Sequence, residues 1–249
     1  MTCSSAPTTD ASGVAGRERQ LLFWTAVSTA AMTATALAIG VTTLPRSGPN
    51  CRSACIGYPY TGGAEFAPRD YWWMYPASLM ALLAVALLMT LPRRDGAVAG
   101  LAARMSVVLA AIAAGALVID YGIQVAVVQP ALIKGETDGI GLLSQYNPHG
   151  VFIALENVGY LLLGLAFAAA GVAADARSRL ERVVRGVFGV GGALTVVALI
   201  GYALVYRADI EYRFEVAGIV IDWLVLIITG VLLGVGSRKR PGTDSAGAR

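Results

Sequence analysis

Long apolar runs separated by short polar segments dominate the chain. Six runs are almost free of ionisable residues, at about residues 21–44, 72–92, 104–128, 150–173, 186–206 and 214–236. A helix needs about 20 mostly apolar residues to cross the hydrocarbon core of a bilayer. The strands of a membrane barrel would instead alternate apolar and polar positions, which these runs do not do. The pattern therefore predicts an all-α, polytopic bundle of six transmembrane helices.

The basic residues predict how the bundle is oriented. With six crossings, thirteen of the 19 Lys and Arg residues fall on the same side as the two termini. Cytoplasmic loops carry an excess of Lys and Arg, so both termini are expected in the cytoplasm and the protein in the cell membrane. We expect a disordered cytoplasmic tail over 1–20, a transmembrane domain over 21–236 and a cytoplasmic tail over 237–249.

Two long loops, about 45–71 and 129–149, are then expected outside. Pro130 and Pro148 bracket the second loop, and both are expected to end helices. Cys51 and Cys55 lie four residues apart in the first loop. Because the outer compartment is oxidising, a disulfide between them is chemically allowed, with two free thiols as the alternative.

Composition excludes several classes of function. The chain is 56% hydrophobic and 14% charged, whereas soluble domains are about one quarter charged. The basic residues lie between apolar runs and form no patch with aromatic partners, so no nucleic-acid partner is expected. No Cys/His ligand set is present, and one histidine cannot supply two axial haem ligands. We expect no metal and no cofactor, and the lipid bilayer as the main partner.

Three acidic residues stand inside the predicted helices: Asp120, Glu156 and Asp222. An ionisable group within a membrane helix costs about 2.5–3.5 kcal/mol on insertion scales, so each one needs a compensating reason. At about 1.5 Å per residue, each acid lies about 9–12 Å below the outer end of its helix. The three carboxyl groups therefore share one level in the outer half of the bilayer.

Other polar side chains fall near this level. Gln124 is one turn above Asp120, and Tyr160 is one turn below Glu156 on the same helix face. The remaining candidates adjoin an acid or stand in the loop above: Asn157, Trp223 and His149. Together these residues predict an outward-facing polar pocket. The alternatives are interhelical hydrogen bonding for the acids and an ordinary loop position for His149.

Two further patterns concern symmetry and association. Residues 118–121 read VIDY and residues 220–223 read VIDW, on helices that run in opposite directions. This would fit an inverted repeat of three helices plus three, an arrangement in which transporters bind substrate between the halves. Gly230 and Gly234 form a GxxxG pair, which could serve packing within the chain or a homo-oligomer.

The stretches "VVQPALIKGE" and "YNPHGVFIALENVGYLL" resemble those of uncharacterised bacterial multi-pass membrane proteins. The resemblance spans most of the chain and implies a bacterial membrane protein, without a function. In outline the chain is also similar to small membrane-integral terpene cyclases, which use intramembrane acids. No motif of those enzymes is present, so no residue role follows from this similarity.

Three functions are compatible with the sequence. The first is binding or transport of a proton or a small apolar or cationic solute at the acidic pocket. The second is an intramembrane isomerase or cyclase, in which a protonated carboxyl group acts as general acid on an apolar substrate. The third is a non-catalytic partner or immunity subunit that acts through its outer loops. A transporter should show a path from both faces, and an enzyme should show a closed apolar chamber with acids on one wall.

Overall fold

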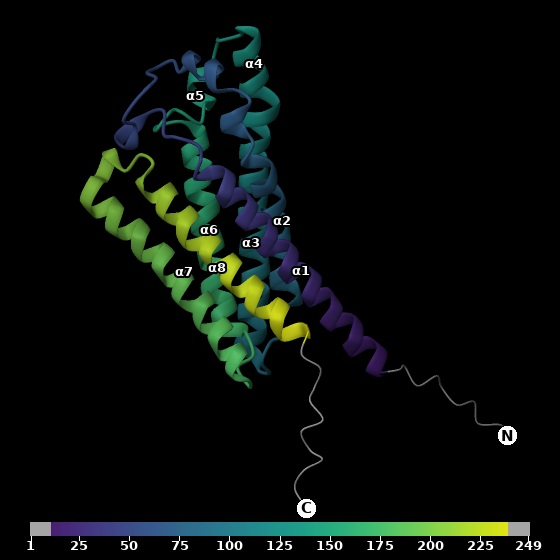
Figure 1. Ribbon diagram of the computed structural model, residues 1–249. Coiled ribbons are helices and arrows are strands. Elements are labelled where there is room, and N and C mark those ends of the chain that lie inside the picture. Colours follow the sequence, from purple (N-terminus) through teal and green to yellow (C-terminus); the bar gives the residue numbers. More distant parts are fainter. Residues whose placement is uncertain (1–10, 239–249) are drawn as a thin grey trace, which may run out of the picture.

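The computed structural model describes residues 11–238, and residues 1–10 and 239–249 lie outside the described part (Figure 1). Its six long helices are α1 (Ala11–Gly40), α2 (Met74–Thr90), α3 (Ala97–Ile123), α6 (Val151–Ala173), α7 (Arg179–Tyr206) and α8 (Arg213–Arg238). Each belongs to a helical segment long and apolar enough to cross a membrane. This confirms the predicted all-α bundle of an integral, multi-pass membrane protein. Helix α1 begins within the expected N-terminal tail, and α8 extends into the expected C-terminal one.

The helix boundaries follow from local chemistry. In lipid, a spanning segment must satisfy its backbone hydrogen bonds internally, which apolar runs do as helices. Helix α7 starts before its apolar run because Ser178 and Glu181 form a capping box. The Glu181 N–H donates to Ser178 Oγ at 3.1 Å, and the Ser178 N–H donates to Glu181 Oε2 at 2.7 Å. The cap therefore sets the start of α7 at Arg179 rather than near residue 186.

The third helix does not end at Pro130, so that expectation was wrong. A π-helical turn, η4 (Gln124–Val128), follows α3 and leads directly into α4 (Gln129–Lys134). Pro130 stands at the start of α4, directly after the π-helical turn. The helix ends instead at Gly135, whose φ of 75° lies in the left-handed region that glycine adopts readily.

Small residues let the helices approach closely. A Cβ added to Gly192 of α7 would meet backbone atoms of Ala168 and Gly164 on α6. A Cβ added to Gly230 of α8 would lie 2.6 Å from the carbonyl oxygen of Ala26 on α1. Gly234 likewise faces Val27 of α1. The GxxxG pair of α8 therefore packs against α1 of the same chain.

The start of α1 and the end of α8 meet at one end of the bundle. Arg19 Nε donates to the Ser237 carbonyl at 2.7 Å. At this end the α2–α3 and α6–α7 connections also pair, because Arg94 N donates to Ala173 O at 3.1 Å and Asp175 N to Pro92 O at 3.0 Å. The long connections lie at the opposite end (Figure 1).

We call the segments 41–73 and 135–150 the cap. They contain the short helices η1 (Gly48–Asn50), η2 (Thr61–Phe66), η3 (Arg69–Tyr71) and α5 (Ile140–Leu143), and a disulfide joins Cys51 and Cys55 with an S–S distance of 2.00 Å. Arg46 Nε and Tyr146 OH each lie 3.3 Å from Oδ2 of the buried Asp70. The Tyr146–Asp70 contact joins the two cap segments over the helix ends, and the Arg46–Asp70 contact holds the first segment together.

The α1–α8 contact predicts the effect of one methyl group. Gly230→Ala should destabilise the protein by about 1–3 kcal/mol, because the added carbon has no space against Ala26 and Ala30. Gly201→Ala is the matched control, since its Cβ would meet no atom within 4 Å. Thermal unfolding in detergent should show a lower midpoint for Gly230→Ala alone. Equal midpoints for both variants would contradict this packing.

Candidate functional site

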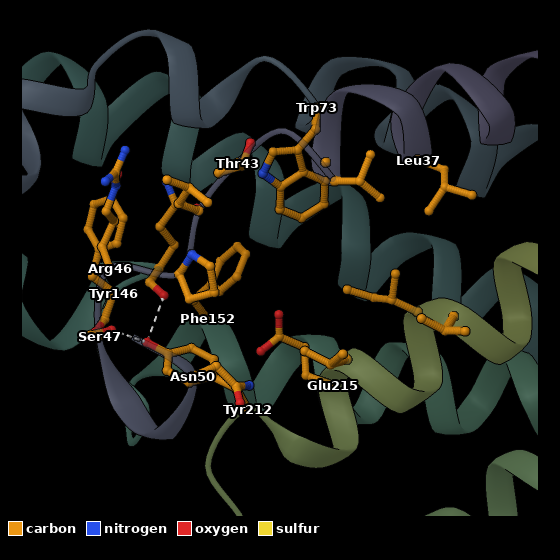
Figure 2. A pocket seen from close by; sticks show the side chains of 18 of the residues that line it. Leu37, Thr43, Arg46, Ser47, Asn50, Trp73, Tyr146, Phe152, Tyr212 and Glu215 are labelled. Atoms are coloured by element: carbon orange, nitrogen blue, oxygen red, sulfur yellow. Dashed lines mark hydrogen bonds between the residues drawn. The ribbon is translucent and has the colours of Figure 1, made fainter. Parts of the chain in front are cut away.

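A cavity of about 290 Å³ lies beneath the cap, between the adjoining ends of α1 and α8 (Figure 2). Its apolar walls come from α1 and α8, and its remaining walls come from the cap, the start of α6 and the residue before α2. The lining residues used below are Leu37, Gly40, Val41, Arg46, Ser47, Trp73, Gln145, Tyr146, Phe152, Tyr212, Glu215, Val216, Ile219, Val220 and Trp223. The cavity thus combines an apolar surface with a few polar groups, as small-molecule sites do.

Aromatic rings form much of the inner wall. The ring centroids of Trp73 and Trp223 lie 6.2 Å apart, and Trp73 packs edge-on against Tyr121 at 5.2 Å. Phe152 and Tyr212 face the same space. The faces of such rings are electron-rich and attract cations as well as apolar groups.

Glu215 brings a carboxyl group into this aromatic space. It stands in the first turn of α8, is only 8% exposed, and has its side chain directed into the cavity in Figure 2. Within residues 11–238 no N–H or O–H group donates a hydrogen bond to it; the carboxyl group of Glu156 on α6 lies beside it, close enough for a carboxyl–carboxyl hydrogen bond. The Oε2 atoms of both residues are buried, and no donor reaches either of them. Because carboxylates can only accept, this bond requires a proton on one of the two residues.

A directional chain of donors ends at Glu156. Tyr121 OH donates to Glu156 Oε1 at 2.8 Å and lies 2.7 Å from Tyr160 OH. Trp223 Nε1 donates to Tyr160 OH at 3.2 Å. The Tyr121 hydroxyl has one proton and donates it to Glu156. The Tyr160 hydroxyl must therefore donate to the Tyr121 hydroxyl. The donors therefore favour the negative charge on Glu156 and the shared proton on Glu215.

Asp120 adds a third acid to this cluster. Its carboxyl group is buried, Oδ2 has no partner, and it interacts electrostatically with both Glu156 and Glu215. Like charges in a low-dielectric site cannot all ionise cheaply. We call Asp120, Glu156 and Glu215, with Tyr121 and Tyr160, the acid cluster.

The other predicted site residues lie elsewhere or have other partners. Gln124 Nε2 donates to Leu143 O at 2.6 Å and its Oε1 accepts from Gln145 N at 3.0 Å, so it ties η4 to the cap. Asn157 is half-buried beside Glu156, with no partner for its Oδ1. His149 is exposed on the cap and does not line the cavity.

Asp222 is buried but does not join the acid cluster. Thr195 Oγ1 on α7 donates to Asp222 Oδ1 at 2.8 Å, so the carboxyl group joins α8 to α7. A Cβ on Gly164 of α6 would touch Thr195. Gly164 lies two turns beyond Glu156, which is about 12 Å along the helix. This contact matches the alternative of interhelical hydrogen bonding.

Glu215 was missed because sequence reasoning counted it among acids at helix ends, which water normally reaches. The structure shows that the cap covers this helix end. Ser47 Oγ donates to Tyr146 O at 2.5 Å and lies 2.7 Å from Tyr212 OH. Burial under the cap raises the pKa of the Tyr212 hydroxyl above its usual value. One signal was available: Glu215 precedes Asp222 by seven residues, two turns on nearly the same helix face.

A second cavity of about 230 Å³ lies at the other end of the bundle, lined by residues of α1, α7 and α8 such as Leu22, Val184 and Leu233. It shares no lining residue with the first cavity. Along α8, the fully buried Leu226 and Thr229 stand between Trp223, which lines the first cavity, and Leu233, which lines the second. Packed side chains therefore separate the two cavities.

In the part of the chain that the structure describes, no three His, Cys, Asp or Glu side chains are arranged to hold a metal ion. Comparison with protein-family models, curated proteins and solved structures found no match to this chain. The functional argument therefore rests on the geometry of the cavity and the acid cluster.

The shared proton can be tested by infrared spectroscopy. We expect a protonated-carboxyl C=O band at pH 7 that loses intensity in both Glu156→Gln and Glu215→Gln. In each variant the glutamine NH₂ can replace the shared proton as donor, so the fold should persist. Glu136→Gln, on the exposed surface, should leave the band unchanged. An unaltered band in both cluster variants would contradict the shared proton.

Proposed function

We propose that this membrane protein binds a small, largely apolar organic cation in the cavity, with the Glu156–Glu215 pair as its counter-charge. The observation that carries this proposal is the position of the Glu156–Glu215 pair beside a cavity with aromatic walls. With one shared proton, the pair carries one negative charge. A buried charge without a partner is costly, so a cation in the cavity would be stabilised by the pair. The Trp73 and Trp223 rings would add cation–π attraction.

The basic side chains nearby are already engaged. Arg46 lines the cavity but pairs with Asp70 at 3.3 Å and lies over the Phe66 ring at 3.7 Å. Arg213, two residues before Glu215, pairs with Glu211 at 3.5 Å and lies over Tyr206 at 4.2 Å. Neither arginine neutralises the acid cluster, which supports a cationic rather than an anionic ligand.

The packed region between the two cavities supports binding over conduction. A transporter in this conformation would be occluded on the inner side of the cavity, and transport would require α1, α6 and α8 to separate. The volume of about 290 Å³ suits a small ligand, since ligand sites usually span about 300–1,000 Å³.

A second candidate function is acid catalysis on an apolar alkene. It is favoured by the donor chain, which directs charge to Glu156 and leaves the proton on Glu215, the member that lines the cavity. Glu215 would transfer this proton to one alkene carbon as the π electrons form the new C–H bond. The neighbouring carbon would become cationic beside the Trp faces. Return of a proton from an adjacent carbon to Glu215 would restore the acid and release an isomerised or cyclised alkene.

Cation binding predicts a preference for charge. The wild-type protein should bind a phenyl- or alkyl-trimethylammonium ion at least about tenfold more tightly than its neutral tert-butyl isostere, a difference of about 1.4 kcal/mol. The double variant Glu156→Gln/Glu215→Gln should lose this preference, because it keeps the volume and removes the charge. Calorimetric titration in detergent measures both ligands. The control Glu136→Gln should behave as wild type, and an unchanged preference in the double variant would refute the proposed counter-charge.

Acid catalysis predicts uptake of solvent deuterium. Incubation with an isoprenoid alkene in deuterated buffer should place deuterium in the recovered alkene, as measured by mass spectrometry. Glu215→Gln should abolish uptake because it removes the proton donor, while Glu156 keeps its charge and cation binding persists. The absence of uptake above buffer with wild-type protein would exclude this second function and leave cation binding as the assignment.

A further inference from the structure

We infer that the ligand is a single-chain cationic amphiphile that enters sideways from the bilayer, through an opening between the capped ends of α1 and α8. This inference rests on the proposed cation site and adds the route of entry and the class of ligand. It follows from where the cavity is open, where it is closed, and how its polar and apolar surfaces are divided.

The opening is placed by residues that line the cavity and also lie on the outer surface of the bundle. Val41, just beyond α1, is 71% exposed, and Val216 and Val220 of α8 are each 46% exposed. Gly40, the last residue of α1, also lines the cavity, and a Cβ added to it would meet no atom within 4 Å. An exposed apolar surface on a membrane helix faces lipid, so this side of the cavity adjoins the hydrocarbon.

The same two helices are closed farther from the cap. Gly230 packs against Ala26 and Ala30, and Gly234 packs against Val27, with no space for an added methyl group. The gap between α1 and α8 is therefore confined to the capped end, at the level of Glu215.

Hydrogen bonds close the roof of the cavity. Ser47 Oγ donates to Tyr146 O, and Tyr212 OH, which has one proton to donate, lies 2.7 Å from Ser47 Oγ and 3.3 Å from Gln145 O. Entry through this roof would break these bonds. Entry between α1 and α8 displaces only lipid from apolar side chains.

The cavity is polar at one end and apolar at the other. In Figure 2, Arg46 and Ser47 lie on one side, Leu37 lies on the opposite side, and Glu215 stands between them. Ile219 and Val220 continue the apolar side along α8. A cationic head would lie against Glu215 and the aromatic rings, while its alkyl chain would extend past Leu37 into the bilayer. A volume of about 290 Å³ favours one chain over two.

The experiment uses tryptophan fluorescence in lipid nanodiscs. A Trp24→Phe/Trp72→Phe background removes two exposed tryptophans and keeps Trp73 and Trp223, which are buried beside the cavity. The probe is a dodecyltrimethylammonium ion brominated within its chain. We expect saturable quenching of the two remaining tryptophans, and at least about 100-fold weaker competition by tetramethylammonium, which has no chain.

Three variants distinguish the route of entry from the cation-binding site. Gly40→Leu should place its side chain in the opening and slow the onset of quenching at least about fivefold. Gly115→Leu, on the exposed face of α3 and equally free of neighbours, should leave the rate unchanged. The double variant Glu156→Gln/Glu215→Gln should abolish saturation.

The outcomes distinguish the two proposals. If tetramethylammonium competes as well as the long chain, or if Gly40→Leu quenches at the wild-type rate, the lateral route is overturned while the cation site stands. If quenching is linear and identical in wild type and in the double glutamine variant, the cation site itself is refuted and the inference falls with it. Saturable quenching, chain dependence and slowing by Gly40→Leu together support both.

Discussion

The hydrogen bond between Glu156 and Glu215 is the contact on which the capped end of the bundle depends. Two carboxyl groups buried between membrane helices repel each other when both are ionised, and the hydrocarbon offers no water to solvate them. One proton turns this repulsion into a bond between α6 and α8. That arrangement survives only where water is excluded, which explains why the cap must close over the start of α8. The chain of tyrosine and tryptophan donors then fixes which member of the pair carries the charge.

The six helices were predictable because the constraint that creates them is local. A run of apolar residues long enough to cross the bilayer has no alternative to an α-helix, whatever its neighbours are. A shared depth for Asp120 and Glu156 could also be predicted, since depth can be counted from a helix end. The role of Glu215 was not, because it depends on loops folding over a helix end. Asp222 shows the converse: it lies on nearly the same face of α8 as Glu215, but two turns farther from the cap, where it bonds to Thr195.

One segment of the α1–α8 pair packs tightly, and another segment of the same pair lines the cavity. Toward the end of the bundle away from the cap, glycines on α8 let the backbones approach until no methyl group fits. Toward the cap, the same two helices present valines and a glycine with open space before it. Van der Waals contact is a main force holding helices together in lipid, so a segment that gives up this contact loses stability. The tight segment and the cap offset that loss, and they restrict the opening to the level of the carboxyl pair.

The division of charge between Glu156 and Glu215 also bears on the choice between binding and catalysis. A cation needs only the net charge of the pair, which remains whichever residue holds the proton. Acid catalysis needs the proton on the member that faces the ligand, and it needs a partner that keeps the charge away from the alkene. The structure provides such a partner, because Tyr121 donates to Glu156 and not to Glu215. The geometry that binds a resting cation would also stabilise a carbocation formed in the same place. The chemistry of the proposed ligand therefore decides between the two proposed functions.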